Sequence, residues 1–165
     1  MICVFMDPSY TVIGYSIWES KGHGSILMAG KVEFPKLKRL HRLGLMLAEM
    51  QNILWAWRAN LMVIEIPSGK VNPLRHKGGG SGLSLYGFGV GALWYMCGTE
   101  AAKCGGRVVG VTAEKWTGGH PKAKREAVAL KTWPRLKQIS DKGHDVADAI
   151  ALGKWWFSVG RKEFE

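Results

Sequence analysis

Apolar residues in the first part of the chain recur with the spacing of β-strands. Residues 2–7, 11–19 and 25–33 show this pattern and predict three successive strands. The segments between them, Pro8-Ser9-Tyr10 and residues 21–24 (KGHG), are typical of hairpin connections. The pattern therefore predicts that an antiparallel meander opens the fold.

Helical spacing of apolar residues begins after this meander. It predicts one helix over residues 37–58 and a second, almost uncharged helix over residues 83–104. Between them, residues 61–66 (LMVIEI) form a short, nearly continuous apolar run. Such a run is expected of a central strand that is covered on both faces of its sheet.

The last third of the chain completes an alternating order of elements. Residues 107–112 (RVVGVT) predict a further strand, residues 122–138 a basic helix after Pro121, and residues 144–158 a final helix. The order βββαβαβαα predicts an α/β fold with a mixed sheet. We find no internal repeat or long linker in the sequence.

Four carboxylates stand inside or at the ends of these apolar segments. Asp7 closes the first strand, Glu65 lies near the end of residues 61–66, and Asp145 and Asp148 share one face of the final helix. Unpaired carboxylates in apolar surroundings are costly, and crowded like charges raise one another's pKa. Magnesium prefers oxygen ligands, and two such ions can hold the attacking water and the leaving oxygen of a phosphodiester.

Each carboxylate also has a structural interpretation. Asp7 could serve the turn at Pro8, Asp145 could be a charge at a helix N-terminus, and Glu65 could pair with a lysine. For Asp148 this interpretation is weaker, because residues 149–152 (AIAL) surround it with apolar side chains. The four positions together favour a metal site.

Composition indicates the class of partner. The 165 residues are enough for one domain with a substantial core, and 47% apolar content excludes general disorder. Twenty-three Lys and Arg against 13 Asp and Glu give a net charge of +10. This excess predicts a negatively charged partner, either nucleic acid or an anionic membrane surface.

Membrane association is the poorer of these two interpretations. No basic segment followed by an apolar one opens the chain, so we expect no signal peptide. The uncharged run 78–99 contains eight glycines, which favours a glycine-rich loop leading into a buried helix. Cys3, Cys97 and Cys104 lack the paired spacing of a zinc site, and we expect reduced core thiols in an intracellular protein.

A basic, glycine-rich loop is predicted over residues 68–82, directly after Glu65. It carries four candidate DNA-binding residues: Lys70, Arg75, His76 and Lys77. The loop is either an ordinary mobile surface segment or a cationic arm that follows a sugar-phosphate backbone. Its position next to Glu65 favours the second interpretation.

Three motifs carry a resemblance to a known family. They are FMDPS followed by Gly14-Tyr15, VIEIPS around Glu65, and GHDVADAIALG around Asp145 and Asp148. In this order they resemble the ribonuclease-H-like nuclease superfamily, and most closely the RuvC-type Holliday-junction resolvases, over nearly the whole chain. The resemblance implies a mixed five-stranded sheet flanked by helices, in a single nuclease domain over residues 1–165.

The resemblance also implies roles for individual residues. The metal-binding carboxylates of the family match Asp7, Glu65, Asp145 and Asp148. Lys115 (in AEKW) and Lys124 (in PKAKRE) resemble its two lysines near the scissile phosphate, with Lys122 as an alternative to Lys124. Such a lysine stabilises charge that develops on phosphoryl oxygens. Lys122 and Arg125 are further candidates for DNA contact, and an exposed basic face is the alternative.

The base-stacking aromatic residue and the role of His144 both leave alternatives open. Family members often carry an aromatic residue shortly after the second carboxylate, and residues 69–72 (GKVN) offer none. Tyr86 or Phe88 would then have to stack on a junction base. His144, beside Asp145, could assist the metal or cap the final helix.

These inferences combine into one predicted activity. We expect a Mg²⁺-dependent endonuclease, with Mn²⁺ as a substitute and two ions per site, that uses water to cut four-way DNA junctions symmetrically and leaves 5′-phosphate and 3′-hydroxyl ends. A homodimer would supply two active sites, with the helix over residues 83–104 as its interface. We expect a cytoplasmic location, in a bacterium or a phage-infected cell.

Other activities remain compatible with the sequence. A related nuclease could act on other branched DNA, on flaps or on RNA-DNA hybrids. A non-catalytic junction-binding protein would use the charge of the chain alone.

Overall fold

A five-stranded mixed sheet forms the centre of the protein. The computed structural model describes residues 1–34, 37–67, 80–141 and 144–164, so the predicted DNA contacts at Lys70, Arg75, His76 and Lys77 lie outside the described residues.

The strands of the sheet are β1 (Ile2–Pro8), β2 (Val12–Glu19), β3 (Ser25–Glu33), β4 (Leu61–Ile66) and β5 (Arg107–Thr112). Their order in the sheet is β3-β2-β1-β4-β5. Pairing is antiparallel for β1 with β2 and for β2 with β3, and parallel for β4 with β1 and with β5. The predicted mixed five-stranded sheet is confirmed.

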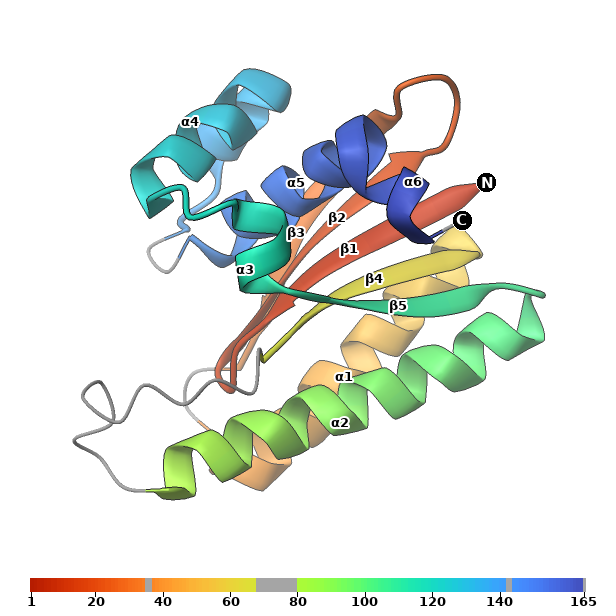
Figure 1. Ribbon diagram of the computed structural model, residues 1–165. Helices are drawn as coiled ribbons and strands as arrows, with labels where there is room; N and C mark the ends of the chain where they lie inside the picture. Colours follow the sequence, from red (N-terminus) through yellow and green to blue (C-terminus); the bar gives the residue numbers. More distant parts are fainter. Residues whose placement is uncertain (35–36, 68–79, 142–143, 165) are drawn as a thin grey trace.

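Helices cover both faces of this sheet (Figure 1). The helices α1 (Arg39–Trp57) and α2 (Gly80–Lys103) lie on one face, whereas α3 (Ala113–Thr117), α4 (Lys122–Thr132), α5 (Asp145–Trp155) and α6 (Arg161–Phe164) lie on the other. Alternate residues of β1 enter two separate cores: Phe5 packs on the α5 side and Met6 on the α1 side. Strand β4 divides in the same way, with Val63 and Ile64 on opposite faces. This double coverage explains the nearly continuous apolar run of β4.

Two glycines bring α5 into direct contact with the sheet. A Cβ atom at Gly14 of β2 would lie 2.1 Å from the carbonyl oxygen of Asp145. A Cβ at Gly153, near the other end of α5, would lie 2.5 Å from Nε1 of Trp18. Between them, the hydroxyl of Ser16 donates a 2.8 Å hydrogen bond to the carbonyl oxygen of Ala149. These contacts fix the helix that carries two of the predicted site carboxylates.

The last part of the chain differs from its predicted helices. The helix expected over residues 122–138 ends at Thr132, and a 3₁₀ helix, η1 (Pro134–Gln138), follows. The break comes before Pro134, because proline disfavours the α conformation in the residue that precedes it. The helix expected over residues 144–158 becomes α5 and a π-helical turn, η2 (Trp156–Gly160). The five-residue helix α3 was not predicted, since one turn is too short to show a period.

The burial of the three cysteines agrees only in part with the prediction. Cys3 and Cys97 are buried as expected, but the prediction of a core thiol is wrong for Cys104, which is exposed after the end of α2. Among the described parts of the chain, no helix combines the length and the apolarity that a bilayer span requires.

We expect Gly14→Ala to lower the free energy of unfolding by about 1–3 kcal/mol, the usual penalty for added volume at a packed site. The new methyl group would collide with the backbone of Asp145. Urea unfolding measures the change. Gly44→Ala in α1 is the matched control, because nothing lies within 4 Å of a Cβ there and alanine favours a helix. Equal midpoints for Gly14→Ala and the wild-type protein would contradict the close contact of β2 with α5.

Candidate active site

The predicted carboxylates come together at one end of the sheet. Strands β1 and β4 are parallel neighbours with Met6 opposite Ile64, so Asp7 and Glu65 follow side by side. Asp7 also pairs with Gly14 of β2, the residue against which the backbone of Asp145 packs. The first turn of α5 therefore brings Asp145 and Asp148 to the ends of β1 and β4. Asp148 is buried, and the other three carboxylates are partly buried.

The carboxylates influence one another through their charges. Burial, followed by the charges of Glu65 and Asp148, raises the pKa of Asp7 well above its ordinary value. Burial also raises the pKa of Glu65 to about 7, although a hydrogen bond from Trp116 opposes the shift. The pKa of Asp145 is raised by burial and then by the charge of Asp141. Ionising all of these groups together requires positive charge nearby.

Arg125 supplies part of this positive charge. Its Nε and Nη2 atoms each donate a 2.7 Å hydrogen bond to Asp148, one to Oδ1 and one to Oδ2. Nη1 donates to the carbonyl oxygen of His120 at 3.0 Å. This bidentate geometry is the strongest form of an arginine-carboxylate pair. Arg125, predicted to contact DNA, here neutralises Asp148.

Sequence reasoning missed two residues that position the carboxylates. Trp116 of α3 donates a 2.7 Å hydrogen bond from Nε1 to Oε2 of Glu65. Asp141 accepts hydrogen bonds from the backbone N–H groups of Val146 and Ala147, at 3.2 and 2.9 Å. The carboxylate of Asp141 therefore caps α5.

Both missed residues left only a weak signal in the sequence. A buried tryptophan needs a partner for its N–H group, and an aspartate shortly before a helix is a common cap. Neither rule identifies the partner. The cap prediction for His144 is not confirmed: its side chain makes no capping hydrogen bond, and its Nδ1 lies 3.4 Å from Oε2 of Glu126.

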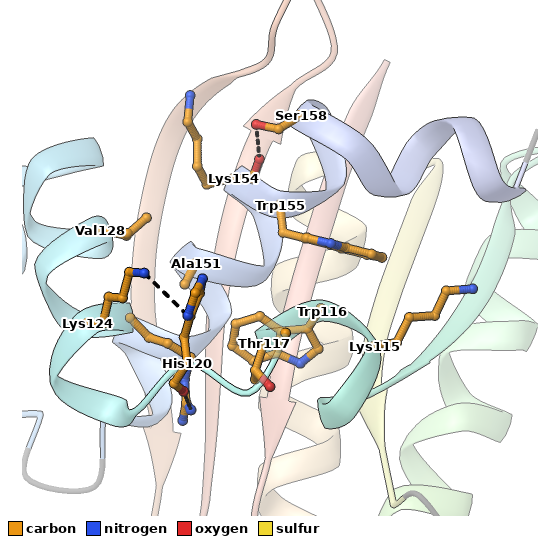
Figure 2. A pocket seen from close by; sticks show the side chains of 12 residues that line it. Lys115, Trp116, Thr117, His120, Lys124, Val128, Ala151, Lys154, Trp155 and Ser158 are labelled. Atoms are coloured by element: carbon orange, nitrogen blue, oxygen red, sulfur yellow. Dashed lines mark hydrogen bonds between the residues drawn. The ribbon is translucent and has the colours of Figure 1, made fainter.

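The candidate lysines take different positions. The ammonium group of Lys115 lies 2.7 Å from Oε2 of Glu163 and 4.4 Å from the ring centre of Phe164, both in α6. Nζ of Lys124 lies 3.3 Å from Nδ1 of His120 (Figure 2). The charge of Lys122, by contrast, lowers the pKa of Asp7, Glu65 and Asp145. Lys122 therefore interacts with three of the four carboxylates.

Tyr86, one of the two candidate aromatic residues, is subject to the charges of two of the carboxylates. Burial raises the pKa of its phenol above the ordinary value, and the charges of Glu65 and Asp7 add to the shift. Phe88 is 58% exposed.

The donors suit a divalent metal by their chemistry. All four are carboxylates, the ligand type that Mg²⁺ and Mn²⁺ prefer, and the raised pKa values of Asp7 and Glu65 show a demand for positive charge. In the described residues, however, the carboxylates are not yet close enough together to coordinate an ion. Within the described ranges, no group of three or more His, Cys, Asp or Glu side chains is placed to hold an ion. Metal binding would require the carboxylates to converge and Asp148 to share or release Arg125.

Comparisons with known proteins identify the fold. No protein-family profile matches the chain, and no curated protein matches its sequence. Solved structures do match. The RuvC protein of Thermus thermophilus, in complex with a Holliday-junction substrate, aligns with a TM-score of 0.68 over 98% of this chain and 96% of its own, at 17% identity.

Two other junction resolvases share the fold. The yeast mitochondrial Holliday-junction resolvase Ydc2 aligns with a TM-score of 0.60, at 11% identity, over 94% of this chain and 77% of its own. The Fowlpox virus resolvase, solved with Holliday-junction DNA, aligns with a TM-score of 0.54, at 11% identity, over 95% of this chain and 97% of its own. The resemblance indicated by the motifs is thus confirmed at the level of the fold, which is that of RuvC and other Holliday-junction resolvases.

Proposed function

We propose that this chain is a metal-dependent endonuclease that resolves four-way DNA junctions. One observation carries the proposal: on the fold of the junction resolvases, Asp7, Glu65, Asp145 and Asp148 meet at one end of the sheet, where burial and neighbouring charges raise the pKa of the first three. Clustered acids with perturbed pKa values are characteristic of active sites. We propose further that residues 1–165 act as a single nuclease domain.

The four carboxylates would hold Mg²⁺ or Mn²⁺, two ions in each site. Bound ions of this kind lower the pKa of water and stabilise the charge on the leaving oxygen of a phosphodiester, so that in-line attack by water leaves 5′-phosphate and 3′-hydroxyl ends. Trp116 orients Glu65 through its hydrogen bond. Lys122, whose charge acts on three of the carboxylates, stabilises the negative charge of the scissile phosphate. Lys115, which pairs with Glu163, and Lys124, which contacts His120, are the further candidates for this role.

Arg125 would have two roles: it pairs with Asp148 and it contacts the DNA backbone. Its guanidinium neutralises Asp148, and a cation bound by Asp148 would weaken that pairing. The planar fork of donors on arginine also suits phosphate oxygens. Arg125 would then contact the DNA backbone, together with Lys122 and the basic residues Lys70, Arg75, His76 and Lys77.

A homodimer would match the symmetry of the substrate. Helix α2 presents the large side chains Phe88, Trp94 and Tyr95 to solvent, with exposed fractions of 58%, 40% and 76%. Exposed aromatic residues on one helix favour a protein interface. We propose α2 as that interface, so that two sites face the two equivalent strands of a junction.

A second candidate is a non-catalytic junction-binding protein. The bidentate pair between Arg125 and Asp148 favours it, because such a pair neutralises a buried carboxylate without a metal. A nuclease with another branched substrate, a flap or an RNA-DNA hybrid is also compatible with the carboxylates. The cleavage assay below separates these candidates.

We expect the purified protein with Mg²⁺ to place paired, symmetric nicks in a labelled four-way junction, and to cut flap and linear duplex DNA far less. Asp7→Asn should reduce cleavage at least about 100-fold, because the variant removes one of the proposed metal-binding carboxylates. A 100-fold loss corresponds to about 2.7 kcal/mol of transition-state stabilisation. Junction binding by this variant should survive in a gel-shift assay. Glu19→Gln, a surface variant, is the control and should cut normally.

Each other outcome points to a different candidate. Equal cutting of the junction, the flap and the duplex would favour a general nuclease. Binding without cutting by the wild-type protein would favour the non-catalytic candidate.

We expect the two α4 lysines to differ in the same assay. Lys122→Gln should slow junction cleavage about 10- to 100-fold, since its charge acts on the carboxylates, whereas Lys124→Gln should have a smaller effect. Both variants lose one positive charge, so they control for general DNA attraction. A larger loss of rate in Lys124→Gln would reverse this assignment.

The pKa of Glu65 predicts opposite pH trends for stability and activity. Its folded value of about 7 lies above its ordinary 4.5, so the folded state binds more protons. Without divalent ions, the free energy of unfolding should therefore fall as pH rises from about 4.5 to about 7, by at most about 1.4 kcal/mol per pH unit for one proton. Cleavage should rise over the upper part of this range, because metal ligands must be ionised.

Urea unfolding and cleavage rates, measured at several pH values, test these trends. Glu65→Gln should flatten the pH dependence of stability. A wild-type stability that rises over this range would contradict the raised pKa.

A further inference from the structure

A cleft of about 300 Å³ opens between α3, α4 and the second half of α5 (Figure 2). This volume is at the lower end of the range for sites that bind small ligands, about 300–1,000 Å³. Its walls hold two tryptophans, Trp116 and Trp155, with Lys124 across from them. It is too small for a DNA duplex, whereas a single nucleotide would suit it.

The charge of the cleft favours an anionic ligand. Lys124 and Lys154 line it from different helices, whereas the guanidinium of Arg125, also in the wall, is paired with Asp148. Of the described residues that form the wall, none is acidic. A concave site with charge of one sign raises the local concentration of oppositely charged groups.

Trp155 forms a fixed aromatic wall of this cleft. It is the last residue of α5, and the π-helical turn η2 brings Gly160 against its ring. A Cβ atom at Gly160 would lie 2.4 Å from Cζ3 of Trp155. Trp155 also makes an edge contact with Trp156, with ring centres 6.5 Å apart. A half-buried indole held in this way can stack on a base with little loss of conformational freedom.

Two residues connect the cleft to the carboxylates. Trp116 lines the cleft and donates its indole hydrogen bond to Glu65, and Arg125 lines the cleft while it binds Asp148. A ligand in the cleft would thus be separated from the carboxylates by one layer of side chains. Trp155 follows Asp148 by two turns of α5, about 10 Å along the helix axis, so a nucleotide near a phosphate held at the carboxylates would reach the cleft.

We propose that this cleft binds one unpaired nucleotide of the DNA strand next to the phosphate at the carboxylates. The base stacks on Trp155, and Lys154 and Lys124 contact the flanking phosphates. This inference deepens the proposed function by naming a subsite for an unstacked base. It assigns the aromatic contact to Trp155, at the end of α5, in place of Tyr86 or Phe88.

Binding of short oligonucleotides in EDTA tests the proposal without cleavage. Fluorescence anisotropy at fixed salt compares a single-stranded thymidine 12-mer with a 12-mer of abasic sites that has the same phosphates. We expect the wild-type protein to bind the thymidine strand about 10-fold more tightly, the effect of about one stacked base. A 12-base-pair duplex, whose bases are paired, reports binding to phosphates alone.

The variants separate the base from the phosphates. Trp155→Leu should bring the ratio of the two affinities close to 1, and Trp155→Phe should keep most of it. Lys154→Gln should weaken both strands about equally and leave the ratio unchanged. Trp55→Leu is the matched control, since Trp55 is 76% exposed on α1 at the other face of the sheet, and its ratio should equal that of the wild-type protein.

Two results would overturn the proposal: a ratio near 1 in the wild-type protein, or an unchanged ratio in Trp155→Leu. If Trp155→Leu unfolds in circular dichroism, the indole N–H signal of Trp155 in NMR spectra of the wild-type protein decides. That signal should shift with the thymidine strand and stay in place with the abasic strand. A protein that shows this ratio but never cuts a junction would retain the nucleotide site and lose the proposed function.

Discussion

The crowding of four carboxylates at one end of the sheet is the constraint to which the surrounding structure responds. Asp7 and Glu65 are neighbours because β1 and β4 are parallel and in register, and α5 brings Asp145 and Asp148 to the same place. Burial and the charges of neighbouring carboxylates raise the pKa of Asp7, Glu65 and Asp145. Arg125, Lys122 and the indole of Trp116 each offset part of this cost.

The backbone around the site explains how so much negative charge is held in place. Gly14 lets the start of α5 touch β2, and Gly153 lets the later part of α5 lie against Trp18. Asp141 caps the first turn of the same helix. The helix that carries Asp145 and Asp148 is thereby fixed at its start and along its length, so a loss at any of these contacts would displace both carboxylates.

Much of this arrangement could be predicted from local patterns. The strands were recognisable by their periodicity, and all four carboxylates by their unusual positions in apolar segments. The partners Trp116 and Asp141 were missed because their contacts join residues that sequence patterns do not connect: Trp116 reaches Glu65 across 51 positions. The break at Pro134, in contrast, follows a local rule and could have been predicted.

The carboxylates and the cleft lined by Trp116 and Trp155 form one continuous region on the α5 side of the sheet. Trp116 and Arg125 belong to both, so a substitution in the cleft that moves either residue should also move Glu65 or Asp148. The charges of the two parts differ: the carboxylates of β1, β4 and the start of α5 gather in one, whereas Lys124 and Lys154 line the other. A strand of DNA could lie across both parts, with a phosphate at the carboxylates and a base in the cleft.

The central claim is that the carboxylate cluster binds divalent cations, and the free energy of unfolding with and without Mg²⁺ tests it most directly. Urea unfolding above pH 7, at constant ionic strength, would compare the wild-type protein with Asp7→Asn. The account predicts that Mg²⁺ stabilises the wild-type protein, by about 2.7 kcal/mol at a concentration 100 times the dissociation constant, and stabilises the variant much less. An equal effect of Mg²⁺ on both proteins, or no effect on either, would contradict it.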